Sequence, residues 1–214
     1  YDAEVEHIEQ FATSFGLDRF NLVAHDYGGF LALGYLRRHP ERVLRLALLN
    51  TRAHNIFRPW FYRFSIGQQW VATHAPAVAR RLPLRRMHHY ALRRYRALGC
   101  FDTAQEGEYL GWMDTPQGRR AFVDFFAHYH VPAVPGLAES LGRIDCPTAV
   151  IWGDRDHYIP FETALELAEH IPHATLTRLR GGDHYIMEER PAEVTAALLD
   201  LLDRAHVANW PRPA

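Results

Sequence analysis

The chain has 214 residues, a length that suits one large domain or a domain carrying a modest insertion. Hydrophobic residues make up 48% and charged residues 23%, which excludes wholesale disorder. The 24 basic and 25 acidic residues leave a formal net charge of -1, so no overall charge favours nucleic acid or an anionic membrane as a partner. Two cysteines, Cys100 and Cys146, are too few for a disulfide framework and predict a cytoplasmic protein.

The spacing of apolar residues predicts an α/β domain. Residues 3–15 have helical spacing and end at Gly16. Predicted strands are residues 20–24, 43–50, 147–152 and 174–179, and further predicted helices are residues 30–39, 161–170 and 192–205. Strands that alternate with helices in this way are typical of a mostly parallel sheet flanked by helices.

Residues 52–141 have a different composition. This stretch is rich in Arg, His and aromatic residues, and prolines at 76, 83 and 116 divide it into several predicted helices. We therefore expect residues 1–51 and 142–214 to form an α/β core and residues 52–141 to form a helical insertion.

The most specific motif follows the first predicted strand. His25-Asp26-Tyr27-Gly28-Gly29 places a polar side chain at a strand-to-helix turn beside small residues, the pattern of a nucleophile elbow. Serine usually stands at the centre of such a turn, whereas here it is Asp26. The helix that begins at the elbow favours negative charge at its N-terminus.

Two later residues complete a catalytic set. Asp156 lies just beyond the third predicted strand, and His184 follows the fourth. The order nucleophile, acid, base is the one expected of an α/β-hydrolase. Asp154 is a rival for the acid, and we interpret it as a turn residue.

Three segments carry a family resemblance: residues 24–29, residues 152–156 and residues 182–188. Together they resemble the α/β-hydrolase superfamily, in the branch with an aspartate nucleophile that holds epoxide hydrolases and haloalkane dehalogenases. The resemblance implies that residues 52–141 form the cap and that Asp26, Asp156 and His184 are catalytic. It also implies that the family's N-terminal strands are missing here, together with the loop that supplies a second oxyanion donor, leaving the Tyr27 backbone N–H as donor.

An aspartate nucleophile indicates the class of substrate. A carboxylate that attacks an ester gains little, whereas attack on an sp³ carbon gives an ester that water can hydrolyse. We expect His184 to activate that water, and we expect a small hydrophobic epoxide as substrate with no cofactor. Cap tyrosines donate a proton in epoxide hydrolases, and the candidates here are Tyr129, Tyr62 and Tyr90.

A haloalkane is the alternative substrate, although dehalogenases of this branch carry Trp directly after the nucleophile, where this chain has Tyr27. Two other functions are a non-catalytic binding protein and a cofactor-free oxygenase of the same fold. The His88-His89 pair lacks the spacing of a strong metal site, so no metal is expected. The arginines of residues 80–96 fit an amphipathic cap helix better than a nucleic-acid surface.

Overall fold

The computed structural model describes residues 1–54, 57–129 and 131–204. The chain divides into two compact units: a core unit, Tyr1–Arg58 with Pro132–Ala214, and a helical unit, Pro59–Val131. The helical unit is thus shorter at both ends than the expected insertion of residues 52–141.

Packing against the core unit explains the shorter helical unit. Arg52 is buried, and its guanidinium lies 3.8 Å from the ring centre of Phe30 and 4.7 Å from that of Phe57. Leu137 is fully buried. These residues therefore belong to the core unit although they flank the helical sequence.

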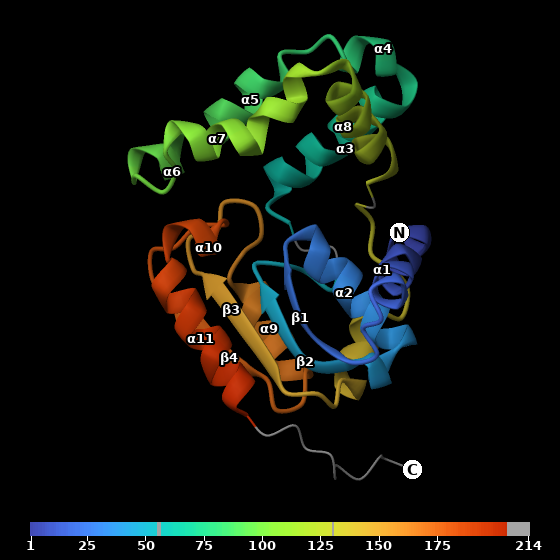
Figure 1. Ribbon diagram of the computed structural model, residues 1–214, viewed down its shortest axis with the longest axis vertical. Helices are drawn as coiled ribbons and strands as arrows, with labels where there is room; N and C mark the ends of the chain where they lie inside the picture. Colours follow the sequence, from blue (N-terminus) through green and yellow to red (C-terminus); the bar gives the residue numbers. More distant parts are fainter. Residues whose placement is uncertain (55–56, 130, 205–214) are drawn as a thin grey trace. The chain divides into compact units, whose positions relative to one another are not determined.

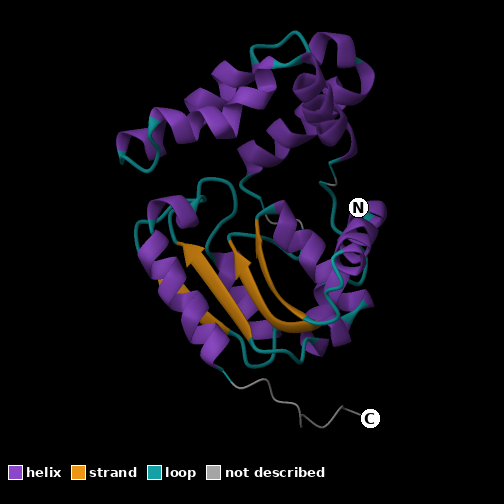
Figure 2. Ribbon diagram, in the orientation of Figure 1, coloured by secondary structure: helices purple, strands orange, loops and turns teal. Residues whose placement is uncertain are grey.

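A four-stranded parallel sheet forms the centre of the core unit (Figures 1 and 2). Its strands are β1 (Phe20–His25), β2 (Val43–Leu49), β3 (Thr148–Gly153) and β4 (Thr175–Leu179), and they lie in this order across the sheet. All three neighbouring pairs are parallel. The predicted parallel α/β architecture is therefore confirmed, and all four predicted strands are present.

Helices cover the sheet as the alternating pattern predicts. The helical elements of the core unit are α1 (Asp2–Ser14), α2 (Tyr27–Arg38), η1 (Pro40–Arg42), η3 (Ala138–Arg143), α9 (Glu162–His170), α10 (Ile186–Glu189) and α11 (Pro191–Asp203). Helix α2 packs on β1 and β2, α9 on β3 and β4, and α11 on β2 and β3, while α1 packs on α2. The expected last residue of the final helix, Ala205, lies outside the described residues.

One hydrophobic cluster joins α11 to the sheet. Ala47 and Leu49 of β2 and Ile151 of β3 pack in it with Val194 and Leu201 of α11. Alternate residues of a strand point to the same face, so this face of β2 is the one that α11 covers.

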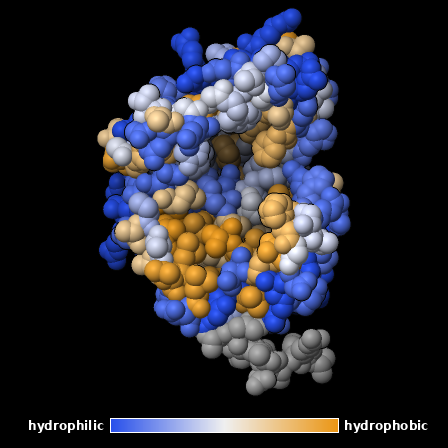
Figure 3. Space-filling view, in the orientation of Figure 1, coloured by the Kyte–Doolittle hydropathy of each residue, from blue (hydrophilic) through white to orange (hydrophobic). Residues whose placement is uncertain are grey.

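The β1 end of this face is less covered. Val23 pairs in register with Ala47 and so shares its face, yet Val23 is 53% exposed. Helix α11 also leaves Leu199 and Leu202 exposed. Figure 3 shows hydrophobic residues gathered on one side of the core unit. In the described residues β1 pairs with β2 alone, so β1 is an edge strand.

The helical unit contains α3 (Pro59–His74), α4 (Pro76–Ala79), α5 (Leu84–Ala91), α6 (Arg93–Ala97), α7 (Thr103–Leu110), η2 (Gly111–Asp114) and α8 (Pro116–His128). Pro76 and Pro116 begin helices, as expected of a residue that lacks a backbone N–H. Helices α3 and α8 pack on one another, and α5 packs on α6, α7 and η2. Within the described residues, no helix is long and apolar enough to cross a bilayer.

Candidate active site

The turn between β1 and α2 has the geometry of a nucleophile elbow. Asp26 has φ 49° and ψ -124°, a strained conformation for a residue with a side chain. Such strain costs about 1–3 kcal/mol and persists where surrounding contacts impose it. Here the Asp26 N–H donates to the Leu49 carbonyl at 3.1 Å, and the Asp26 carbonyl accepts from the Thr51 hydroxyl at 2.5 Å. Both β2 and the residues after it therefore hold the elbow.

The two glycines of the elbow differ in their surroundings. A Cβ atom on Gly29 would lie 2.4 Å from the Thr51 hydroxyl oxygen and 2.6 Å from the Thr51 Cβ. A Cβ atom on Gly28 would meet nothing within 4 Å. Only Gly29 is therefore required for the close approach of α2 to the end of β2.

We expect Gly29→Ala to lower the free energy of unfolding by about 1–3 kcal/mol, the cost of overpacking a close contact. The matched control Gly28→Ala should be neutral or slightly stabilising, because alanine favours helix over glycine. Urea unfolding of the two variants beside the parent chain measures the difference. Equal stability of the two variants would show that Thr51 moves aside without cost.

Asp156 and His184 form a buried pair at the ends of β3 and β4. The Asp156 Oδ2 atom lies 2.8 Å from the His184 Nδ1 atom. The side chain of Asp156 is fully buried, and that of His184 is 4% exposed. The Asp156 Oδ1 atom accepts from the backbone N–H groups of Tyr158 at 2.6 Å and Ile159 at 2.9 Å. These bonds orient the carboxylate toward the imidazole.

The pairing of Asp156 with His184 depends on how closely two loops approach. A Cβ atom on Gly153 would lie 2.3 Å from the Asp183 carbonyl oxygen, so glycine lets the His184 loop rest on the end of β3. Asp183 shapes this loop by accepting from the backbone N–H groups of His157 and His184, at 3.0 and 2.9 Å. Asp154 instead accepts a hydrogen bond from the Gly181 N–H at 2.7 Å. This contact lies within a turn and does not involve the His184 side chain.

The reactive nitrogen of His184 faces the elbow. Its Nε2 atom lies 3.7 Å from the Asp26 Oδ2 atom, and the Asp26 side chain is 39% exposed. The carboxyl ends of parallel strands meet at one edge of the sheet, which is why Asp26, Asp156 and His184 come together from distant parts of the chain. The structure thus brings the three predicted residues into one site.

The charges of Asp26, Asp156 and His184 shift one another's pKa values. Burial would lower the pKa of His184, but Asp156 and Asp26 outweigh it and raise that pKa to about 10. Desolvation would raise the pKa of Asp26, but His184 outweighs it and the pKa lies below the ordinary value. The same balance lowers the pKa of Asp156. At neutral pH the resting site therefore holds an imidazolium between two carboxylates.

Asn50, which the sequence analysis missed, supports the acid. This fully buried residue follows β2 and has φ 38°. Its Nδ2 atom donates to the Asp156 Oδ2 atom at 2.6 Å, and its Oδ1 atom accepts from the Gly153 N–H at 3.2 Å. The available signal was a polar residue directly after a buried strand, at the same sheet edge as Asp26.

Three rings surround His184 and were also missed. The ring centres of His25, Tyr158 and Tyr185 lie 4.6, 4.9 and 5.1 Å from that of His184. His25 donates from Nε2 to the His184 carbonyl at 3.0 Å, and burial lowers the pKa of His25 to about 4, so this ring is neutral. Burial, with the charge of Asp26, raises the pKa of Tyr185, which keeps its phenol protonated.

Tyr27 has two distinct roles. Its backbone N–H begins α2 beside Asp26 and helps to lower the pKa of the Asp26 carboxyl. Its hydroxyl donates to the Glu4 carboxylate at 2.7 Å, so the side chain contacts α1. The position of the backbone N–H suits the predicted oxyanion donor.

The three candidate proton donors belong to the helical unit. Tyr129 is 6% exposed, and its ring packs beside Phe125 and Phe126 at centre distances of 5.6 and 5.8 Å. Tyr62 is 37% exposed, while Tyr90 is 65% exposed and has the Arg93 guanidinium 4.1 Å from its ring centre. Their part in catalysis remains a prediction.

A turn carboxylate, a buried His–Asp pair and a parallel sheet define an α/β-hydrolase type of site. The model of the alpha/beta hydrolase fold family matches residues 2–191. The chain therefore belongs to the alpha/beta hydrolase fold family.

Two curated proteins that are similar to this chain have different activities in their names. The human 1-acylglycerol-3-phosphate O-acyltransferase ABHD5 is 26% identical over 225 residues, covering 93% of this chain and 62% of the relative. A cis-3-alkyl-4-alkyloxetan-2-one decarboxylase from Shewanella oneidensis is 26% identical over 194 residues, covering 83% of this chain and 58% of the relative. The chain therefore spans about 60% of the length of these curated relatives.

A solved structure shares the fold. The Bacillus megaterium epoxide hydrolase in complex with an inhibitor matches with a TM-score of 0.66 and 20% identity, over 95% of this chain and 76% of that chain. At this identity the likeness concerns the fold.

Proposed function

We propose that this chain catalyses hydrolysis through an alkyl ester formed on Asp26, with a small hydrophobic epoxide as substrate. The observation that carries the proposal is the carboxylate at the strained elbow, 3.7 Å from the Nε2 atom of a histidine that Asp156 orients. The names of two similar proteins, an epoxide hydrolase and a decarboxylase of an oxetan-2-one, support a strained oxygen ring as substrate.

The first step uses Asp26 as nucleophile. A carboxylate oxygen attacks a ring carbon, the carbon–oxygen bond of the epoxide breaks, and the released alkoxide takes a proton from a donor. In the second step, water loses a proton to His184 and attacks the ester carbonyl. The Tyr27 N–H would stabilise the oxyanion, and collapse of the tetrahedral intermediate releases a diol and the Asp26 carboxylate. The proton that His184 took from water then returns to the donor of the first step, which restores both groups.

The charge on Asp26 explains how His184 becomes a base. Asp26 helps to raise the pKa of His184 to about 10 in the resting site, so the imidazole is protonated there. Ester formation removes the Asp26 charge and with it one of the causes that raise the pKa. His184 therefore loses its proton more readily once the ester is present, when a base is required.

A haloalkane is the alternative substrate. Halide release needs N–H or similar donors at the departing ion, and the phenol of Tyr27 is engaged with Glu4. An alkoxide is more basic than a halide and gains more from a tyrosine, so the chemistry favours the epoxide.

Two further alternatives follow from the same fold. A non-catalytic binding protein would have no use for a buried Asp156 that is hydrogen-bonded by Asn50 and His184. A cofactor-free oxygenase would consume oxygen, and an oxygen electrode distinguishes this reaction from hydrolysis.

A matched panel of epoxides and bromoalkanes tests the substrate class. We expect diol formation from the epoxides to exceed bromide release. We also expect Tyr129→Phe to reduce epoxide turnover by roughly 10²–10⁴-fold, the range of general acid catalysis. Gas chromatography of the diols and a bromide electrode measure the two reactions.

Tyr109→Phe, at a half-exposed tyrosine of the same unit, is the control and should turn over epoxides at the parent rate. Dominant bromide release, without an effect of Tyr129→Phe, would assign the chain to dehalogenation. Oxygen uptake without hydrolysis would favour the oxygenase.

A further inference from the structure

The loop that carries His184 and the elbow that carries Asp26 start from opposite edges of the sheet. Asp26 follows β1 and His184 follows β4, and the strand order places these two strands at the two edges of the described sheet. Neighbouring strands lie about 4.8 Å apart, so β1 and β4 are about 14 Å apart. The loop after β4 must reach across the ends of two strands. The 3.7 Å between the His184 Nε2 atom and the Asp26 Oδ2 atom therefore depends on what holds that loop.

The backbone of His184 is held on both sides. Its N–H donates to the Asp183 Oδ1 atom at 2.9 Å, and its carbonyl accepts from the His25 Nε2 atom at 3.0 Å. Asp183 belongs to the same loop, whereas His25 is the last residue of β1 and directly precedes Asp26. The His25 ring also lies against the His184 ring, with centres 4.6 Å apart. His25 thus joins the backbone of the proposed base to the strand that carries the proposed nucleophile.

A neutral donor suits this position. His25 lies beside an imidazole that is protonated in the resting site, so a cationic donor such as lysine would repel it. Burial, followed by the charge of His184, lowers the pKa of His25 to about 4. The His25 ring therefore donates a hydrogen bond at neutral pH without adding a second positive charge.

We propose that His25 is a positioning residue, which fixes His184 at the elbow through its hydrogen bond to the His184 carbonyl. The effect on rates rests on the hydrolysis proposed above, in which only the second step needs His184 as a base. Attack by Asp26 needs an ionised carboxylate, and the lowered pKa of Asp26 supplies one at neutral pH. Loss of the His25 donor should therefore slow hydrolysis of the alkyl ester and leave its formation nearly unchanged. A general loss of structure would slow both steps.

Three variants of His25 separate the hydrogen bond from the ring. His25→Gln keeps a donor at about the reach of Nε2, His25→Phe keeps a ring without a donor, and His25→Met keeps neither while it matches Gln in length. His170→Phe is the matched control, because the His170 ring also bonds to a backbone carbonyl, that of Glu166 at 2.8 Å, at the exposed end of α9. Thermal unfolding followed by circular dichroism shows which variants fold.

Rapid-quench mass spectrometry of the peptide that contains Asp26 measures formation and hydrolysis of the ester, with an epoxide in excess. We expect His25→Phe and His25→Met to hydrolyse the ester roughly 10²-fold more slowly, the effect of misplacing a reacting group by about 1 Å. His25→Gln and His170→Phe should hydrolyse it at close to the parent rate. Equal slowing of both steps, or a defect in His25→Gln as large as that in His25→Phe, would overturn the proposal.

Titration of His184 by nuclear magnetic resonance tests the same position without a substrate. The titratable groups around its ring are Asp26, Asp156, His25, Tyr158 and Tyr185. The variants change only His25. We expect the pKa of His184 to fall from about 10 by about one pH unit in His25→Phe and His25→Met, because the Nε2 atom moves away from the Asp26 carboxylate. The pKa should stay near 10 in His25→Gln.

An unchanged pKa of His184 in both His25→Phe and His25→Met would overturn the positioning role. This readout is independent of the proposed hydrolysis. If no ester forms in the parent chain or in His184→Gln, the hydrolysis fails, and the titration still decides whether His25 positions His184.

Discussion

Replacing Asp26 by Ala or Asn should reduce turnover by roughly 10⁴-fold or more, the scale of losing a covalent nucleophile. Asn is nearly isosteric and tolerates a positive φ, so it removes the charge while the elbow at φ 49° is retained. His184→Gln should instead allow the alkyl ester to form and then accumulate, because the water that hydrolyses it is no longer activated. Mass spectrometry of peptides from the His184 variant should show the adduct on the peptide that contains Asp26.

The elbow variants and the histidine variant thus give opposite results for the adduct. Asp26→Asn should carry none, and the double variant Asp26→Asn with His184→Gln should also carry none. Turnover by Asp26→Ala at the parent rate would contradict the proposed mechanism. An adduct on another residue would reassign the nucleophile.

Replacing Asp156 by Asn should reduce turnover by roughly 10⁴-fold, the effect seen when a triad acid loses its charge. The cause lies in its contacts: Asp156 accepts from His184, Asn50, Tyr158 and Ile159. An amide in its place would present donors to donors and would no longer orient the imidazole. Asp154→Asn, at the neighbouring turn carboxylate, is the matched control and should retain most of the activity, since Asp154 contacts Gly181 and Arg178.

The same pair predicts a pH dependence of stability. The pKa of His184 is raised from 6.5 to about 10 in the folded chain. A raised pKa contributes stability that is fully present below pH 6.5 and is lost as the pH rises through 10. Asp156→Asn removes much of this contribution. The difference in free energy of unfolding between the parent chain and the variant should therefore shrink between these two pH values.

Urea unfolding at a series of pH values measures this difference. The Asp154→Asn variant serves again as the control, because Asp154 does not contact His184, and its stability should run parallel to that of the parent chain. A gap between the parent chain and Asp156→Asn that stays constant from neutral to alkaline pH would show that His184 does not hold a proton in the folded site.

The sequence by itself determined the local features of this protein. Short apolar runs, separated by segments with helical spacing, specified the four parallel strands. Prolines marked where helices of the helical unit begin. The run from His25 to Gly29 specified the elbow, because a tight strand-to-helix turn needs small residues next to it. The order of Asp26, Asp156 and His184 then followed from their positions after successive strands, at an edge where parallel strands end together.

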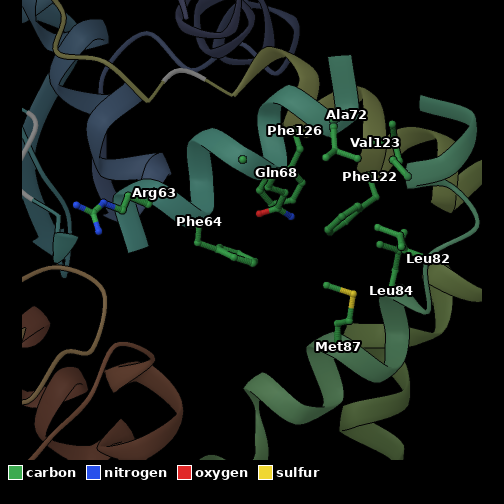
Figure 4. A pocket seen from close by; sticks show the side chains of 13 residues that line it. Arg63, Phe64, Gln68, Ala72, Leu82, Leu84, Met87, Phe122, Val123 and Phe126 are labelled. Atoms are coloured by element: carbon green, nitrogen blue, oxygen red, sulfur yellow. The ribbon is translucent and has the colours of Figure 1, made fainter. Parts of the chain in front are cut away.

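Only the tertiary structure decided which residues support the site. Asn50 and Asp156 are 106 residues apart in the chain, and no local pattern links them. Gly28 and Gly29 look equivalent in sequence, yet only Gly29 faces Thr51 across the packed elbow. The apolar pocket of the helical unit likewise forms only where side chains of α3, α5 and α8 meet (Figure 4). Local spacing encodes strands and turns, whereas close approach, burial and the pKa of His184 depend on residues that folding brings together from distant positions.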